Sequence, residues 1–205
     1  MLKPIDGLRF FEDIHRYTLN GRLLACSVTG VVGHNMSAKT RAYIDSTKHI
    51  WLPRGLAGHK ALEQHLLGQP VDPDETYQPW IDSLLAHGIW KDAETLAVEY
   101  RLCDERKSLA GSFDFLIRTG KGAVILGDLK TVETANAANS RKPATEQLGA
   151  YAAMLIDHHP QLTIDKCCTV VAGPGITRVI TQDPSECISA WLDCWDAYQL
   201  LQPDF

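Results

Sequence analysis

Three consecutive strand patterns between residues 94 and 130 constrain the fold more than any other feature of the chain. The stretches ETLAVEYRLCD, SLAGSFDFLIR and GAVILGDLK are rich in β-branched, aromatic and aliphatic residues. The turn Thr119-Gly120-Lys121-Gly122 between the second and third stretches is too short for a crossover to a parallel strand. The sequence therefore predicts an antiparallel meander in the middle of the chain.

Helical and strand patterns flank this meander on both sides. Helices are expected at 55–67 with a stop at Gly68, at about 74–87, at 144–159 and at about 184–201. Two more strands are expected around Gly173-Pro174-Gly175, a hairpin at Asn20-Gly21, and a short helix capped by Ser27 or Thr29. The polar segment 134–145 is too poor in apolar residues for the core. This order of elements indicates an α/β or α+β fold, read as one domain over 1–205.

Composition narrows the class of protein without identifying it. The apolar fraction of 45% and charged fraction of 22% are those of an ordinary globular domain. A net charge of −5 gives no overall attraction to nucleic acid, so such binding would need a local basic patch. No apolar run approaches the length of a membrane span and no signal peptide is evident, which predicts a cytoplasmic protein with reduced cysteines and no membrane partner.

A carboxylate and an ammonium group end the third strand pattern. Asp128 and Lys130 are two apart, so their side chains share one face of the strand. An exposed ion pair is the simplest explanation and is worth about 0–1 kcal/mol. Asp114, between Phe113 and Phe115 on the preceding strand, would face away from both aromatics and approach Asp128 across the turn. A divalent cation would relieve the repulsion between two converging carboxylates, and oxygen ligands suit Mg²⁺ or Mn²⁺.

Two further pairs of polar residues have helical spacing. Gln147 and Tyr151 are four apart on one helix, as are His59 and Glu63 on another, so each pair lies on one helical face. Taken alone, each pair is explained by ordinary packing and solvation.

In their order along the chain these motifs resemble the RecB-like branch of the PD-(D/E)XK nucleases. The resemblance covers about residues 54–155 and rests on His59 in GLAGHKALE, Asp114 in GSFDF, the stretch Asp128-Leu129-Lys130, and Gln147 with Tyr151. It implies an α/β restriction-endonuclease-like core over 54–202, with a mixed central sheet flanked by helices, preceded by an extension over 1–53.

The resemblance also implies roles for these residues. Asp114, Asp128, the Leu129 carbonyl and His59 would bind one or two Mg²⁺ or Mn²⁺ ions. Lys130 beside a metal-bound carboxylate is expected to stay charged and to stabilise charge on the scissile phosphate. Gln147 and Tyr151 would orient the active site and the DNA strand. No role is assigned to Glu63 or Glu99.

The implied partner is DNA, as single strands or ends. Its backbone would contact basic residues near the motifs, chiefly Arg141 and Lys142, with Lys121, and also Tyr151. The compact length, and a segment Ser27-Val28-Thr29 similar to one in small phage-type and mitochondrial-type exonucleases of this branch, favour a stand-alone exonuclease. Ring-forming relatives leave a homo-oligomer open.

Three alternatives remain at the level of sequence. Some relatives, including CRISPR-adaptation nucleases, hold an iron–sulfur cluster. The cysteines available here are Cys26, Cys167, Cys168, Cys187 and Cys194. They lack a CxxC group, and adjacent Cys167 and Cys168 would face opposite sides of a strand, so buried thiols are the favoured interpretation. A non-catalytic DNA-binding domain and an enzyme acting on small phosphate esters are the other two.

Overall fold

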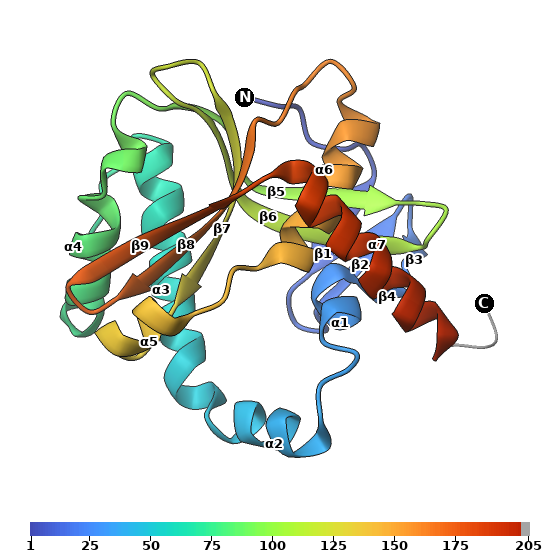
Figure 1. Cartoon of the computed structure of the whole chain (residues 1–205), viewed down its shortest axis with the longest axis horizontal. Coiled ribbons are helices and arrows are strands. Elements are labelled where there is room, and N and C mark those ends of the chain that lie inside the picture. Colours follow the sequence, from blue (N-terminus) through green and yellow to red (C-terminus); the bar gives the residue numbers. More distant parts are fainter. Residues whose placement is uncertain (202–205) are drawn as a thin grey trace.

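A computed structural model describes residues 1–201 and shows an α/β fold with a mixed six-stranded sheet (Figure 1). The strand order is β4-β6-β7-β8-β9, and β5 pairs with the other edge of β6. The strands are β4 Cys26–Ser27, β5 Glu94–Asp104, β6 Leu109–Arg118, β7 Val124–Thr131, β8 Lys166–Gly173 and β9 Ile176–Gln182. This arrangement is compatible with a restriction-endonuclease-like core.

The predicted meander is confirmed. Strand β6 runs antiparallel to both β5 and β7, whereas β7 and β8 run parallel, and β8 and β9 are again antiparallel. The parallel pair needs a crossover, which α5 Ala135–Ser140 and α6 Thr145–His158 provide. The crossover places β8 beside β7, the strand that carries the DLK stretch.

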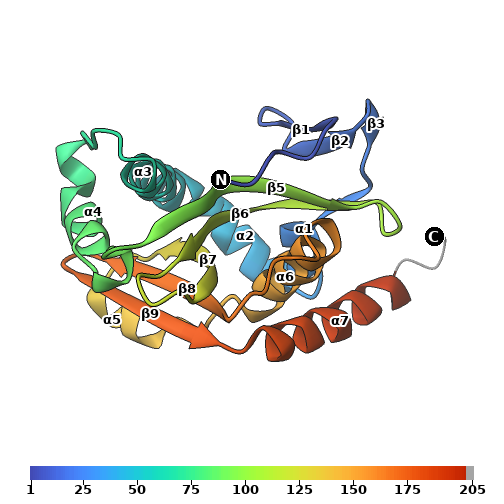
Figure 2. The same ribbon diagram turned by 90° about the horizontal axis from the view of Figure 1, so that it is seen from above.

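Helices cover both faces of this sheet (Figure 2). On one face, α1 Val28–Val32, α6 and α7 Pro184–Leu200 enclose a cluster that includes Phe113, Tyr151 and Trp191. On the other face, α3 Lys48–Leu66 and α4 Gln78–Leu85 enclose a second cluster that includes Leu62 and Phe115. The sheet between them is therefore buried on both sides near its centre.

A separate three-stranded sheet precedes this core. It consists of β1 Leu8–Phe11, β2 Arg16–Leu19 and β3 Arg22–Leu23. The Asn20-Gly21 hairpin turn is confirmed, since both residues have positive φ (51° and 81°) as such a two-residue turn requires. Its inner face packs on Cys103 of β5 and Ala110 of β6.

The helix boundaries depart from expectation at three places. The structure has helix α2 Ala38–Ser46, and α3 begins at Lys48, so Pro53 lies inside α3 instead of preceding it. The polar segment contains α5, whose Ala138 is fully buried, so part of this segment does reach the core. The helix expected at 74–87 begins as the 3₁₀ turn η1 Glu75–Tyr77, and a second turn, η2 Gly88–Trp90, follows α4.

The chain is not divided at residue 53. Helix α3 runs through that position, and β4 pairs with β6 in parallel. Ser27 caps α1, whose Val28 and Val31 are fully buried in the core cluster, which confirms the predicted cap. The expected extension over 1–53 is thus partly core. Within residues 1–201, no helix has the length and apolar character needed to cross a membrane.

Candidate active site

The site lies where two neighbouring strands separate. Pairing between β6 and β7 ends at Phe115 and Gly127, immediately before Asp114 and Asp128. The backbone N–H of Leu129 donates to Asp114 Oδ2 instead of to a β6 carbonyl. Both carboxylates are buried, with 7% and 1% of Asp114 and Asp128 exposed. An ionised carboxyl group at such a position needs a cation or hydrogen-bond donors.

The sequence predicted that the two aromatic neighbours of Asp114 share one face of the strand, and this prediction is wrong. Phe113 stacks with Tyr100 in the cluster under α6, whereas Phe115 packs edge-on against Trp90 in the cluster under α3 and α4. The strict alternation of a regular strand is therefore broken across Asp114. A local irregularity of this kind depends on the neighbouring strands, and residue alternation alone cannot reveal it.

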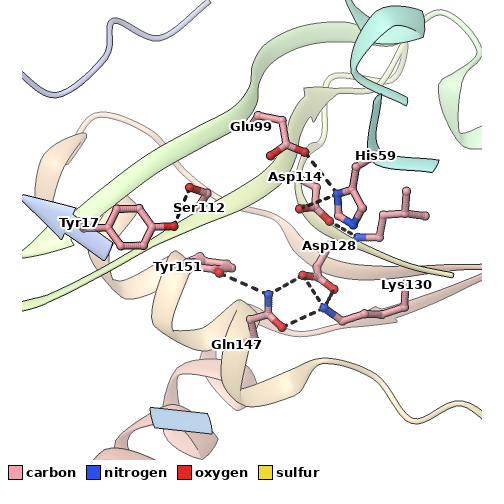
Figure 3. Close-up of polar contacts among 10 residues, drawn as sticks. Tyr17, His59, Glu99, Ser112, Asp114, Asp128, Lys130, Gln147 and Tyr151 are labelled. Atoms are coloured by element: carbon pink, nitrogen blue, oxygen red, sulfur yellow. Dashed lines mark hydrogen bonds and ion pairs between the residues drawn. The ribbon is translucent and has the colours of Figure 1, made fainter. Parts of the chain in front are cut away.

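Three side chains from three elements meet at Asp114 (Figure 3). His59 of α3 places its Nδ1 atom 3.4 Å from Asp114 Oδ1 and 3.3 Å from Glu99 Oε1 of β5. The ligand atoms of His59, Glu99 and Asp114 all lie within 4.8 Å of one another. One nitrogen and two carboxylate oxygens at this separation form a donor set that a divalent cation can use.

Glu99 is the member of this cluster that sequence reasoning missed. Its neighbours Val98 and Tyr100 pair with Phe115 and Phe113, so Glu99 stands opposite Asp114 in the register. Its φ of 45° is unusual for a residue within a strand. One feature of the sequence could have identified Glu99. It is a carboxylate within the largely apolar stretch AVEYRL, and an antiparallel meander with a short turn places this position opposite Asp114.

A second group of contacts holds Lys130. Its Nζ atom lies 2.8 Å from Asp128 Oδ2 and donates to Gln147 Oε1 at 3.0 Å. Gln147 Nε2 donates to Asp128 Oδ1 at 2.6 Å and to the Tyr151 hydroxyl at 3.3 Å. Because the amide of Gln147 contacts all three partners, it fixes the ammonium group beside the buried carboxylate.

The two buried aspartates have opposite pKa shifts. Burial raises the pKa of Asp128 to about 6, although Lys130 opposes this rise. For Asp114, burial alone would raise the pKa, but the adjacent His59 and Lys130 outweigh burial and lower it. For His59, burial disfavours the cation, but Asp114 and Glu99 outweigh burial and raise the pKa well above its usual value. The protonation states of these residues therefore depend on the charged side chains that they contact within the site.

The residues present fit a divalent cation. Besides the cluster of His59, Glu99 and Asp114, the buried Asp128 Oδ2 atom accepts no hydrogen bond from any residue in 1–201, and its nearby partner is the Lys130 ammonium in an ion pair. An oxygen atom in this state has a free lone pair to offer. Leu129 is positioned by its N–H group, and the role implied for its carbonyl stays a prediction.

Of the four residues expected at the nucleic acid, Tyr151 is buried and the other three are exposed. Tyr151 is only 1% exposed, which leaves no surface for a DNA strand, and its hydroxyl accepts a hydrogen bond from Gln147. Lys121 is exposed in the turn before β7, at the end of this strand opposite Lys130, and its role stays a prediction. Arg141 and Lys142 are exposed in the connection between α5 and α6, and their role stays a prediction.

The cysteines are free thiols at positions within the core or at its edge. Cys167 and Cys168 pack in the two different apolar clusters, which confirms that they face opposite sides of β8. Burial raises the pKa of Cys26 to about 11 and that of Cys168 to about 12, so both thiols are held in the neutral form.

Comparison with known proteins gives little further information. No protein-family model and no curated protein matches the chain. Among solved structures it is similar to one described as "Crystal structure of SSO0001", with 16% sequence identity and a TM-score of 0.37 over 83% of this chain and 75% of the other. At this TM-score the likeness carries no conclusion about function.

Proposed function

We propose that the protein is a metal-dependent deoxyribonuclease that hydrolyses phosphodiester bonds, acting as a stand-alone exonuclease on DNA ends or single strands. The observation that carries the proposal is the Lys130 ammonium, held by Asp128 and Gln147 beside the cluster of His59, Glu99 and Asp114. A purely structural ion pair would not need this second cluster of ligand-type side chains next to it. The ordered resemblance to RecB-like nucleases supports the same proposal.

His59, Glu99, Asp114 and Asp128 would together hold Mg²⁺ or Mn²⁺. Such a cation, when bound, would lower the pKa of a water molecule so that hydroxide is available as the nucleophile near neutral pH. It would also offset negative charge on the phosphoryl oxygens. Lys130 would stabilise the negative charge that builds up on the phosphate, because its ammonium group is fixed before the substrate arrives. Gln147 holds that ammonium group, and its own amide nitrogen donates to Asp128 and to the Tyr151 hydroxyl.

The test is cleavage of end-labelled single-stranded and duplex DNA with Mg²⁺, with Mn²⁺ and with a chelator, comparing wild type, Asp128→Asn and Lys60→Ala. Lys60 is an exposed neighbour of His59 and serves as the control. We expect wild type and Lys60→Ala to degrade DNA only with metal, and Asp128→Asn to be inactive while still folded. Turnover of a small phosphodiester without any cleavage of DNA would contradict the proposal, as would a folded but inert wild type.

A further inference from the structure

The outer face of the three-stranded sheet β1–β3 carries an unexpected set of side chains. The pairs Arg9–Thr18, Phe11–Arg16 and Thr18–Leu23 lie directly opposite each other, so these residues share one face. The other face carries Leu8, Tyr17 and Leu19, which are buried. Phe11 and Leu23 are 42% and 54% exposed, and Arg9 and Arg16 are also exposed.

This outer face has no acidic residue, in a protein whose net charge is −5. The acidic pair Glu12–Asp13 lies in the turn between β1 and β2, beyond the paired positions. A shallow hollow of about 450 Å³ lies on the sheet, and Arg9, Phe11 and Thr18 contribute to its lining. The Arg9 guanidinium and the exposed Phe11 ring line this hollow, and Arg16 lies opposite Phe11 on the same face. Such a surface complements a strand of phosphates and unstacked bases.

The sheet is anchored next to the candidate active site. The Tyr17 hydroxyl lies 3.1 Å from the Ser112 hydroxyl, two residues from Asp114 on β6 (Figure 3). Arg101, two residues from Glu99 on β5, places its guanidinium carbon 5.9 Å from the Phe10 ring centroid. Figure 2 shows β1–β3 on the same side of β5 as α3, which carries His59. A strand that passes from the carboxylates toward this sheet therefore stays on one side of the molecule.

We infer that the outer face of β1–β3 is a binding platform for single-stranded DNA, on which Phe11 stacks a base and Arg9 and Arg16 contact phosphates. The inference rests on the proposed function for its choice of DNA, but the surface itself is separate from the residues that would cut the strand. It gives a protein of net negative charge the local basic patch that strand binding needs. It also gives the N-terminal sheet a role in substrate selection.

The test is binding of a fluorescent thymidine oligonucleotide of about 20 residues in a chelating buffer, where binding is measured without cleavage. We expect Phe11→Ala and Arg9→Glu each to raise Kd by about five- to a hundred-fold, and the Arg9 variant to reduce the salt slope by about one. Lys91→Glu, the same change of charge on an exposed lysine outside this sheet, should change Kd less than about twofold.

Unchanged Kd values in folded Phe11→Ala and Arg9→Glu would overturn the inference, and an equal loss in Lys91→Glu would also overturn it by showing a nonspecific effect of charge. These outcomes are separable from failure of the proposed function. If wild type cleaves DNA and the sheet variants bind normally, only the platform is rejected. If wild type binds through the sheet but never cleaves, only the nuclease is rejected.

Discussion

At the scale of single residues, protons and a cation compete for the same atoms. Asp128 has a pKa of about 6 because it is buried, and the pKa of His59 is raised well above its usual value by Asp114 and Glu99. Near neutral pH the metal-free site therefore keeps a proton on His59. A cation that takes the imidazole nitrogen must displace this proton, since only the neutral ring has a lone pair to donate.

Metal affinity should accordingly rise with pH. Between pH 5.5 and 7.5 we expect Mn²⁺ affinity to increase by about tenfold or more, because protonation of His59 and of Asp128 both oppose binding at the lower pH. Calorimetry in buffers of different ionisation enthalpy would measure the proton release directly. Binding that is independent of pH and of buffer would show that His59 and Asp128 are not ligands.

Glu99 should contribute to the same site, although no motif identified it. Replacing Glu99 by Gln keeps the shape but removes the charge next to His59 and Asp114, and should weaken Mn²⁺ binding by about tenfold. Glu105→Gln, in the exposed β5–β6 turn, is the matched control. Equal Mn²⁺ affinities for the two variants would remove Glu99 from the ligand set.

At the scale of elements, the site depends on where strand pairing stops. Runs of apolar and β-branched residues predicted β5, β6 and β7, and their order predicted that Asp114 would approach Asp128. Local pattern could not predict that β6 and β7 separate just past Gly127, because that depends on tertiary contacts of both strands. It also missed the start of α3, since Pro53 normally marks a helix beginning. The helical pairs, Gln147 with Tyr151 above all, were predictable because i,i+4 spacing needs no tertiary information.

The packing of α6 against α7 depends on Gly149. A Cβ atom at Gly149 would lie 1.9 Å from the Cys187 carbonyl oxygen, which is backbone of α7 and cannot rotate away. Gly149→Ala should therefore lower the free energy of unfolding by about 1–3 kcal/mol, despite the better helix propensity of alanine. Gly88→Ala, where no atom lies within 4 Å of the added Cβ, should change it by less than about 0.5 kcal/mol. Denaturant unfolding that ranks the two variants equally would contradict this packing.

At the scale of the whole molecule, folding brings together the carboxylates that would hold a cation. Glu99, Asp114 and Asp128 come from three strands and are brought together only in the folded state. A cation that binds the folded state alone stabilises the entire chain by mass action. The site and the stability of the fold are therefore linked.

Mn²⁺ at about 100 times its Kd should raise the melting temperature by about 5–10 °C, since that excess contributes about 2.7 kcal/mol. Asp114→Asn should abolish most of this increase, whereas Asp193→Asn on the exposed face of α7 should keep it. Thermal unfolding with and without Mn²⁺ checks both variants. A similar increase in both would mean that the cation binds elsewhere.

The most direct measurement of the central claim is the single-turnover rate of DNA cleavage by Lys130→Met at saturating Mn²⁺, beside wild type and Lys91→Met. Methionine keeps most of the side-chain volume but removes the ammonium group that Asp128 and Gln147 hold. The account predicts a rate about a hundred-fold or more below wild type with Mn²⁺ still bound, and an unaffected control. Cleavage by Lys130→Met at the wild-type rate would contradict it, and the pair at the end of β7 would then be a structural ion pair.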